Sequence, residues 1–314
     1  MTVLENLPRR VEIIEVGPRD GLQREQTYIT VEEKAVLVQD LVRAGLKRIQ
    51  VTSFVHPRAV PQMADAEELC MQLAPFPDII YSGLALNRKG VERAHNAGLQ
   101  HIDISVSASD SHSRRNANRS LKEALVEFDE MFALARSFGM TIRGGIQCAF
   151  GYQVPADVDP ETVVAIARHY LGLGVDELAL ADSSGLANPR QLVALLDPLL
   201  TIAGDTPVIL HLHDTRGMGL ANVLAALKMG VRYFDTAFGG LGGCPFIDGA
   251  TGNIATEDTV HMLAAMGIET GIDLLQVAAI SRRFEQRLGK ASLPGKLYAL
   301  LTPEAVEAVE GGGQ

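Results

Sequence analysis

Short apolar segments alternate with amphipathic stretches along this chain of 314 residues, and this alternation limits the folds that it can adopt. The segments have the length and β-branched composition of strands. They span residues 11–16, 48–52, 79–85, 101–106, 141–147, 177–181, 208–213 and 232–237. Strands that alternate with helices pair in parallel through right-handed crossovers, and eight such units can close into a barrel. We therefore expect an α/β fold, a (β/α)8 TIM barrel.

The stretches between these segments have the period of helices. They span residues 30–44, 87–97, 121–138, 160–173, 189–202, 219–229 and 257–266. Thr30 and Glu33 have the spacing of a capping box at the start of the first helix. Several helices end in a small residue or glycine followed by an aliphatic residue and a strand, as in AGLKRIQVTS and MGVRYFDTAF. Glycine can take the left-handed conformation that ends a helix, so these junctions indicate a repeated helix-to-strand unit.

Two further helical patterns, at residues 272–288 and 303–309, have no strand after them. We expect a TIM-barrel catalytic domain over residues 1–270 and a C-terminal helical extension over residues 271–314 that packs on the barrel. The length fits one barrel, since such domains typically occupy about 250 residues. No long polar linker divides the chain.

Charge and composition exclude several classes of function. The formal net charge is -10 and the sequence pI is about 5.3, so the surface repels phosphate backbones and we expect no nucleic-acid partner. No stretch approaches the ~20 apolar residues of a membrane-spanning helix, and the first residues lack the apolar centre of a signal peptide. We therefore expect a cytoplasmic protein without a membrane partner. The three cysteines, Cys70, Cys148 and Cys244, lie far apart, which supports neither a disulfide framework nor a thiolate zinc site.

Polar residues that follow the strands are the candidates for a site, because active sites of TIM barrels lie at the carboxyl ends of the strands. Arg19, Asp20 and Gln23 follow the first strand, and HLHDT ends the seventh with His211, His213 and Asp214. The segments VTSFVHPRAVPQM after the second strand and FGGLGGCPFIDGATGNIATED after the eighth are further candidates.

The pair His211 and His213 indicates a metal site, since residues two apart in a strand point to the same face. Two hydrogen-bonded core histidines would give the same pattern. The first, seventh and eighth strands are neighbours in a closed barrel, so Asp20 and a polar residue after the eighth strand can reach the same point. Two imidazoles, a carboxylate and a carbonyl-type oxygen suit Mg²⁺ or Mn²⁺, and Zn²⁺ is also compatible.

Arg19 and Cys244 are the candidates for catalysis beside this site. An arginine can hold a carboxylate or stabilise a developing oxyanion, although a surface ion pair is the alternative. Cys244 lies in a glycine-rich segment, where it is either a small buried residue or a proton donor above the pocket. Cys70 has the spacing of a core residue, and Cys148 falls at the end of the fifth strand.

Other polar residues lie where substrate contacts or support of the ligands would occur. We expect Asp214 to orient an imidazole from behind the ligands. Substrate contacts are expected near the fourth and sixth strands and in loops, at Asp103, Ser105, Ser107, Asp182, Ser183, Ser184, His56 and His112.

These residues and motifs resemble the 3-hydroxy-3-methylglutaryl-CoA lyase family, metal-dependent enzymes within a lyase and synthase superfamily of TIM barrels. The resemblance runs from about residue 7 to residue 272. Its strongest stretches are EVGPRDGLQ, TSFVHPRAVPQMAD, HLHDTRGMGLANVLAALKMGV and GLGGCPFIDGATGNIATED.

The resemblance assigns roles to matching positions. It implies a metal held by Asp20, His211, His213 and Asn253. It implies that Arg19, Asp20 and Cys244 are catalytic, with Arg19 polarising the carbonyl that forms and Cys244 as the acid of the loop. We expect substrate contacts from Gln23, Gln50, Ser53 and Gly243, and support of the site by Asp214 and Glu257. The implied reaction is retro-Claisen cleavage of 3-hydroxy-3-methylglutaryl-CoA to acetyl-CoA and acetoacetate by a homodimer.

Three positions depart from the family pattern. Gln50 stands where these lyases usually carry Glu, Gln26 replaces the usual Lys, and Tyr152 stands where a second Cys is usual. A related lyase for citramalyl-CoA or an isoprenoid-derived 3-hydroxyglutaryl-CoA is therefore an alternative. A condensing synthase is a second alternative, although the chain has no room for a long regulatory region. The third is a barrel that binds without turnover because Gln50 has disabled it.

Overall fold

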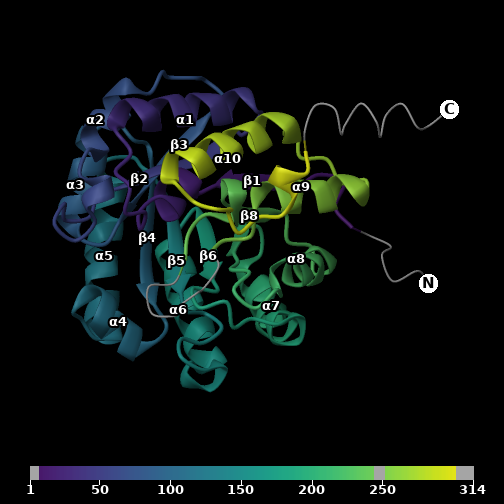
Figure 1. Ribbon diagram of the computed structural model, residues 1–314. Coiled ribbons are helices and arrows are strands. Elements are labelled where there is room, and N and C mark those ends of the chain that lie inside the picture. The colour runs from purple at the N-terminus through teal and green to yellow at the C-terminus, as the bar shows by residue number, and fades with distance from the viewer. Residues whose placement is uncertain (1–6, 244–251, 302–314) are drawn as a thin grey trace, which may run out of the picture.

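Eight parallel strands close into a barrel in the order β1-β2-β3-β4-β5-β6-β7-β8. The computed structural model in Figure 1 describes residues 7–243 and 252–301. The strands are β1 (Glu12–Glu15), β2 (Arg48–Ser53), β3 (Ile80–Ala85), β4 (His101–Ser107), β5 (Thr141–Gln147), β6 (Glu177–Ala181), β7 (Val208–His211) and β8 (Tyr233–Thr236). β1 pairs with β8 through the register Glu12 to Tyr233 and so closes the barrel. The predicted TIM barrel is confirmed.

The helices surround the barrel (Figure 1). They are α1 (Val31–Arg43), α2 (Ala66–Gln72), α3 (Arg88–Asn96), α4 (Asp110–Ala117), α5 (Leu121–Ser137), α6 (Pro160–Leu173), α7 (Pro189–Ala203), α8 (Gly219–Lys228), α9 (Thr256–Ala265) and α10 (Leu274–Leu288). Within the described ranges, no helix has the length and apolar character needed to cross a membrane. The predicted helix at 303–309 and Cys244 lie outside the described residues.

Local sequence signals explain most of these boundaries. Thr30 and Glu33 form the expected capping box at the start of α1, with reciprocal hydrogen bonds of 3.3 and 2.9 Å. Gly45, at the junction between α1 and β2, has φ +97°, and a Cβ there would lie 2.3 Å from the carbonyl oxygen of Gly271. Only glycine combines this backbone conformation with so close an approach.

Two helices and one strand end differ from the sequence prediction. The segment that forms α4, DSHSRRNA, buries only His112 and Ser113, so it lacks the apolar period that identifies a helix. The short helix α2 lies in a stretch for which only the spacing around Cys70 indicated a helix. β7 ends at His211 rather than at His213, because His213 leaves the barrel ladder and pairs with Asn253 in an antiparallel bridge.

α10 lies along α1 and also contacts α9 (Figure 1). Its apolar face buries Val277, Ala278 and Phe284. In addition, Ser281 of α10 donates a hydrogen bond to the buried carboxylate of Glu257, the second residue of α9. The part of the C-terminal extension that the structure describes therefore packs on the first and the last of the long outer helices, α1 and α9.

Candidate active site

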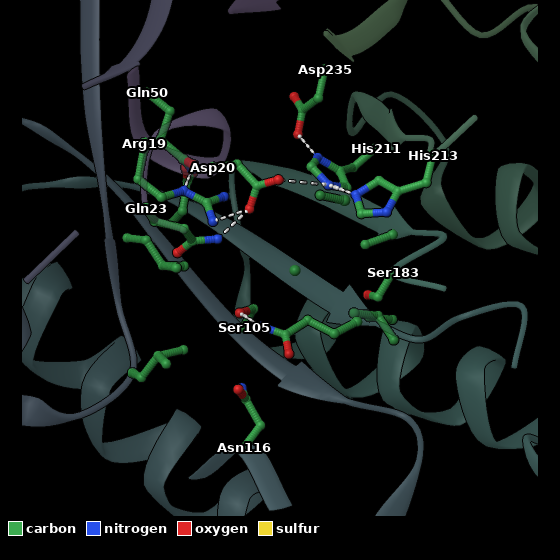
Figure 2. A pocket seen from close by; sticks show the side chains of 18 of the residues that line it. Arg19, Asp20, Gln23, Gln50, Ser105, Asn116, Ser183, His211, His213 and Asp235 are labelled. Atoms are coloured by element: carbon green, nitrogen blue, oxygen red, sulfur yellow. Dashed lines mark hydrogen bonds and ion pairs between the residues drawn. The ribbon is translucent and has the colours of Figure 1, made fainter. Parts of the chain in front are cut away.

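A cavity of about 220 Å³ lies at the carboxyl ends of the strands. Figure 2 shows Arg19, Asp20 and Gln50 on one side of it and His211 and His213 on the other. Farther along the cavity wall are polar side chains from β4 and the following helix, Ser105 and Asn116. The cavity therefore joins the candidate metal site to a second polar region.

Arg19 and Asp20 lie on a single π-helical turn, Gly17–Gly21, directly after β1. Three successive amides, those of residues 19 to 21, donate to the carbonyl oxygen of Val16, which gives the turn its tight form. Gly17 is required there, because a Cβ would lie 2.4 Å from Phe238 Cδ1. The Gly-Pro-Arg-Asp-Gly sequence thus directs both charged side chains into the cavity.

Glu15, the last residue of β1, anchors this turn to the segment after β8. Its Oε1 accepts hydrogen bonds from the amides of Gly17 (2.7 Å) and Phe238 (3.0 Å), and its Oε2 accepts one from Thr256 Oγ1 (2.6 Å). Burial raises the pKa of Glu15 to about 8. One buried carboxyl group therefore holds together the two segments that carry Asp20 and Gly243.

Asp20, His211 and His213 converge, as the sequence predicts. One ligand atom from each lies within 4.8 Å of the others, and the Nε2 atoms of the two histidines are 3.1 Å apart. His211 Nε2 is 3.9 Å from Asp20 Oδ2. We call Asp20, His211 and His213 the metal group, because their ligand atoms could together hold a divalent metal ion.

Asn253 reaches the same point because residues 252–254 pair with residues 212–214. Ile254 donates its amide to Leu212 O at 3.1 Å, and Asn253 Nδ2 donates to Asp20 Oδ2 at 2.8 Å. The Oδ1 atom of Asn253 is buried and has no hydrogen-bond partner among the described residues. A buried amide oxygen without a partner, next to two imidazoles and a carboxylate, fits a cation ligand.

The charges of the group also suit a cation. Burial opposes ionisation of Asp20, but Arg19 and the two histidines outweigh it and hold the pKa of Asp20 well below its usual range. Burial, with the neighbouring His211 charge, lowers the pKa of His213 to about 3. An ionised carboxylate and a neutral imidazole are the forms that bind metal ions.

Asp235 of β8, and not Asp214, contacts an imidazole from behind. Its Oδ2 lies 3.0 Å from His211 Nδ1 (Figure 2). Arg143 of β5 holds the same carboxylate with contacts of 3.0 and 2.5 Å. The role predicted for Asp214 is therefore corrected. Asp214 Oδ1 accepts the amide of Gly219 at 2.7 Å, because its side chain turns toward the start of α8.

No motif in the sequence points to Asp235 or Arg143. Each is a charged residue inside an apolar strand segment, in YFDT and TIRGGIQ, and each side chain faces the barrel interior. A charged residue at an inward-facing position of a strand is the sequence signal that could have identified both residues as part of the site. The ion pair lowers the pKa of Asp235 to about 2, with burial opposing the Arg143 charge.

Gln50 of β2 lies between Arg19 and Asp103 of β4. Arg19 Nε donates to Gln50 Oε1, and Gln50 Nε2 donates to Asp103 Oδ2. Arg19 also holds Asp20 through Nη1 at 2.6 Å, and Gln23 Nε2 donates to the same Asp20 oxygen at 2.8 Å. Gln23 and Gln50 therefore line the cavity beside the metal group, where substrate contacts were predicted.

The other residues expected to contact substrate or support the site are more dispersed. Gly243 lines the cavity at the start of the segment that carries Cys244. Ser53 is buried, and the described residues that line the cavity include its neighbour Val55 but not Ser53 itself. Glu257 accepts the amide of Gly239 at 2.9 Å. It therefore supports the segment after β8, and among the described residues it makes no hydrogen bond to Asp20, His211 or His213.

The polar region of the cavity contains some of the remaining candidates. Ser105 accepts a hydrogen bond from Gln147 Nε2 at 2.7 Å, and Ser183 and His112 also line the wall. Asp103 also lines the cavity, beside Gln50. His56 lies in an exposed turn, where its Nδ1 accepts the amide of Arg58.

Three of the candidate residues have local structural roles. Asp182 accepts the amides of Leu186 and Ala187 and so orders the loop after β6. Burial raises the pKa of the Cys70 thiol to about 12, which agrees with a core residue. Cys148 is buried, with φ +55°, and its amide donates to Ser183 Oγ at 3.0 Å.

Known proteins share this sequence and this fold. The HMGL-like family model matches residues 10–283. A 3-hydroxy-3-isohexenylglutaryl-CoA/hydroxy-methylglutaryl-CoA lyase from Pseudomonas aeruginosa is 39% identical over 94% of this chain and 99% of its own length. An (R)-citramalyl-CoA lyase from Chloroflexus aurantiacus is 41% identical over 89% of this chain and 92% of its own.

A solved structure of a relative has the same fold as this chain. It is an HMG-CoA lyase from Acinetobacter baumannii in complex with coenzyme A and 3-methylmalate. It superposes with a TM-score of 0.89 at 37% identity, over 96% of this chain and 99% of the other.

Proposed function

The chain belongs to the HMGL-like family, and on this premise we propose that it cleaves 3-hydroxy-3-methylglutaryl-CoA into acetyl-CoA and acetoacetate. The observation that carries the proposal is the convergence of Asp20, His211 and His213 beside Arg19 in a cavity at the carboxyl ends of the strands. The names of the P. aeruginosa and A. baumannii relatives support the same reaction.

Asp20, His211, His213 and Asn253 would hold the divalent ion in this proposal. Two imidazoles and two oxygen ligands without a thiolate favour Mg²⁺ or Mn²⁺, and Zn²⁺ is also compatible. When bound, the ion would act as a Lewis acid and a template for the hydroxyl and acyl oxygens of the substrate. Asp235 would fix the ring orientation of His211.

In this proposal Arg19 would stabilise the carbonyl oxygen that forms during cleavage. Gln50 and Asp20 hold its Nε and Nη1, and its Nη2 makes no hydrogen bond to a described residue. A base removes the proton of the substrate hydroxyl, the bond between the hydroxyl-bearing carbon and the carbon next to the thioester breaks, and the electron pair of that bond passes to the acetyl-CoA enolate. The remaining N–H groups of Arg19 can donate to the new ketone oxygen.

Cys244 is the proposed acid that protonates the enolate carbon. It follows Gly243, which lines the cavity. We expect Cys244→Ala to reduce turnover by about 10²- to 10⁴-fold while Mn²⁺ binding, measured by calorimetry, is retained. Cys70→Ala, in α2, is the matched control. Unchanged turnover in Cys244→Ala would reject the catalytic role.

A panel of acyl-CoA thioesters tests the proposed reaction. The purified protein is assayed with 3-hydroxy-3-methylglutaryl-CoA, citramalyl-CoA and an isohexenyl analogue, each with Mg²⁺ or Mn²⁺ and with EDTA, and released acetyl-CoA is measured. We expect metal-dependent release, fastest with 3-hydroxy-3-methylglutaryl-CoA. No release from any thioester would rule out the lyase.

Citramalyl-CoA is the second candidate substrate. The C. aurantiacus relative, 41% identical, is named for this activity. The wall around Ser105, Gln147 and Ser183 is polar, which suits a small polar substrate better than an alkenyl chain. A higher kcat/KM for citramalyl-CoA in the same panel would establish this alternative.

The homodimer and the cytoplasmic location remain predictions from the sequence. Light scattering after size exclusion measures the oligomeric state. Fractionation of cells that express the protein measures its location.

A further inference from the structure

Gln50 occupies a buried position between a cation and an anion. Its side chain accepts from Arg19 Nε and donates to Asp103 Oδ2, and Gln50 and Asp103 are 2% and 6% exposed. A guanidinium can only donate hydrogen bonds, and an ionised carboxylate can only accept them. A carboxamide, with one oxygen and one NH₂ group, satisfies both neighbours at once.

Asp103 is itself held by other residues inside the barrel. Ser82 Oγ of β3 donates to its Oδ2 at 3.3 Å, and Arg143 Nε of β5 lies 3.9 Å from its Oδ1. Arg143 makes the two-point contact with Asp235 described above. Asp103 therefore has a fixed place, from which it can determine the orientation of the Gln50 amide.

This orientation determines where Arg19 can point. With its NH₂ group toward Asp103, Gln50 directs its oxygen toward Arg19 Nε, while Asp20 holds Nη1 at 2.6 Å. These two contacts fix the plane of the guanidinium at the cavity wall (Figure 2). Without the Asp103 contact, the amide could turn and present its NH₂ group to the cation.

We propose that Gln50 and Asp103 form a matched positioning pair, in which Asp103 fixes the Gln50 amide and the amide aims Arg19 at the reacting oxygen. The proposal rests on the proposed lyase function, because Arg19 has its role there. The proposal also gives the amide at position 50 a positive role, in contrast to the alternative that Gln50 disables the site. The amide does not disable the site, because a carboxylate at the same place would face the carboxylate of Asp103 in a buried environment.

Exchange of the two functional groups tests the pair. The wild type is compared with Gln50→Glu, Asp103→Asn and the double variant Gln50→Glu/Asp103→Asn. In the double variant the acid at position 50 can accept from Arg19 and from the new amide at position 103, so donors and acceptors match again. We expect each single variant to lower kcat by about tenfold with little change in KM, and the double variant to recover most of the loss.

Gln100→Glu is the control for the exchange of an amide for an acid. Gln100 is exposed, directly precedes β4 and does not line the cavity, so we expect kcat to stay within about twofold of the wild type. Gln50→Met, which keeps the volume and removes both hydrogen bonds, replaces Gln50→Glu if that variant does not fold. We expect it to lower kcat as well.

Three results would overturn the pair: a gain in kcat from Gln50→Glu, a double variant no better than the product of the two single effects, or an unchanged kcat in Gln50→Met. Thermal unfolding of the wild type and the three exchange variants, without substrate, gives a second measure of the coupling between positions 50 and 103. If the wild type cleaves no thioester, the lyase proposal fails. In that case, a Tm shift of the double variant that equals the sum of the two single-variant shifts would refute the pair separately.

Discussion

The layer between the strands and the outer helices differs in kind from the interior of the barrel. The outer layer is one continuous apolar cluster that includes residues from every strand. Among the described residues, the apolar cluster of the interior has five buried members, Ile14, Val16, Ala179, Ile209 and Ala237. The rest of the interior that the structure describes includes a buried network of polar and charged side chains, Gln50, Asp103, Arg143, His211 and Asp235.

The strand alternation explains the difference. In β7, Val208 and Leu210 belong to the outer cluster, whereas Ile209 and His211 face inward. The outward positions stabilise the fold by burial of apolar area, which is nondirectional. The inward positions hold charges that need partners at fixed distances, because an unpaired buried charge is strongly destabilising. We therefore expect outer-layer variants to change stability and inner variants to change the chemistry.

The largest effect is expected at the metal group. His213→Ala removes a ligand, so we expect turnover to fall by about 10³-fold or more and Mn²⁺ affinity to fall with it. His169→Ala, an exposed histidine on α6, is the matched control. Assays of acetyl-CoA release and calorimetric titration with Mn²⁺ measure the two effects. Full activity in His213→Ala would show that the convergence of the histidines is only structural.

Asp235→Asn tests the support behind the metal group. The carboxylate orients His211 and neutralises Arg143, so we expect about a 10- to 100-fold loss of metal affinity or activity. Asp214→Asn is the control, since Asp214 instead caps the start of α8. A larger loss of Mn²⁺ affinity in Asp214→Asn than in Asp235→Asn would contradict the structure and support the original sequence prediction.

Leu196→Ala tests the outer layer. Leu196 is fully buried on α7, and its truncation should lower the free energy of unfolding by about 2–5 kcal/mol. Because it lies in the apolar layer, kcat should be unchanged well below the unfolding temperature. Val193→Ala, on the same helix and 37% exposed, should change stability much less. Urea unfolding and steady-state assays distinguish the layers, and a kcat defect in Leu196→Ala would break the distinction.

The last prediction concerns pH and the buried carboxyl of Glu15. Its folded pKa of about 8 exceeds the value of about 4.3 in an unfolded chain, so the folded state keeps a proton that the unfolded state releases. The free energy of unfolding therefore falls as pH rises between these values, by at most about 1.4 kcal/mol per pH unit, and levels off above pH 8.

Glu15→Gln should remove this slope, measured as the difference from the wild type in urea unfolding at a series of pH values. The difference is the correct measure, because burial also raises the pKa of Glu257 in the wild type. Parallel pH profiles for the two proteins would show that Glu15 is already ionised near neutral pH.

Much of the fold and part of the site could be predicted from the sequence, because both depend on local patterns. The apolar period gave the eight strands within a few residues, and the motifs around Asp20 and His213 gave the metal group. Residues that share a strand or follow its end have their positions fixed by the chain itself. The polar helix α4 escaped prediction because little of its surface is apolar.

The sequence by itself therefore determined the barrel and the residues at the mouths of its first, seventh and eighth strands. Only the tertiary structure decided which inward charges meet. Asp103 is 53 residues from Gln50, and Arg143 is 92 residues from Asp235. The closed barrel brings these side chains together across its interior, and no local period records such a contact. For the same reason Asp235 took the place predicted for Asp214, and Gln50 gained a partner that explains its amide.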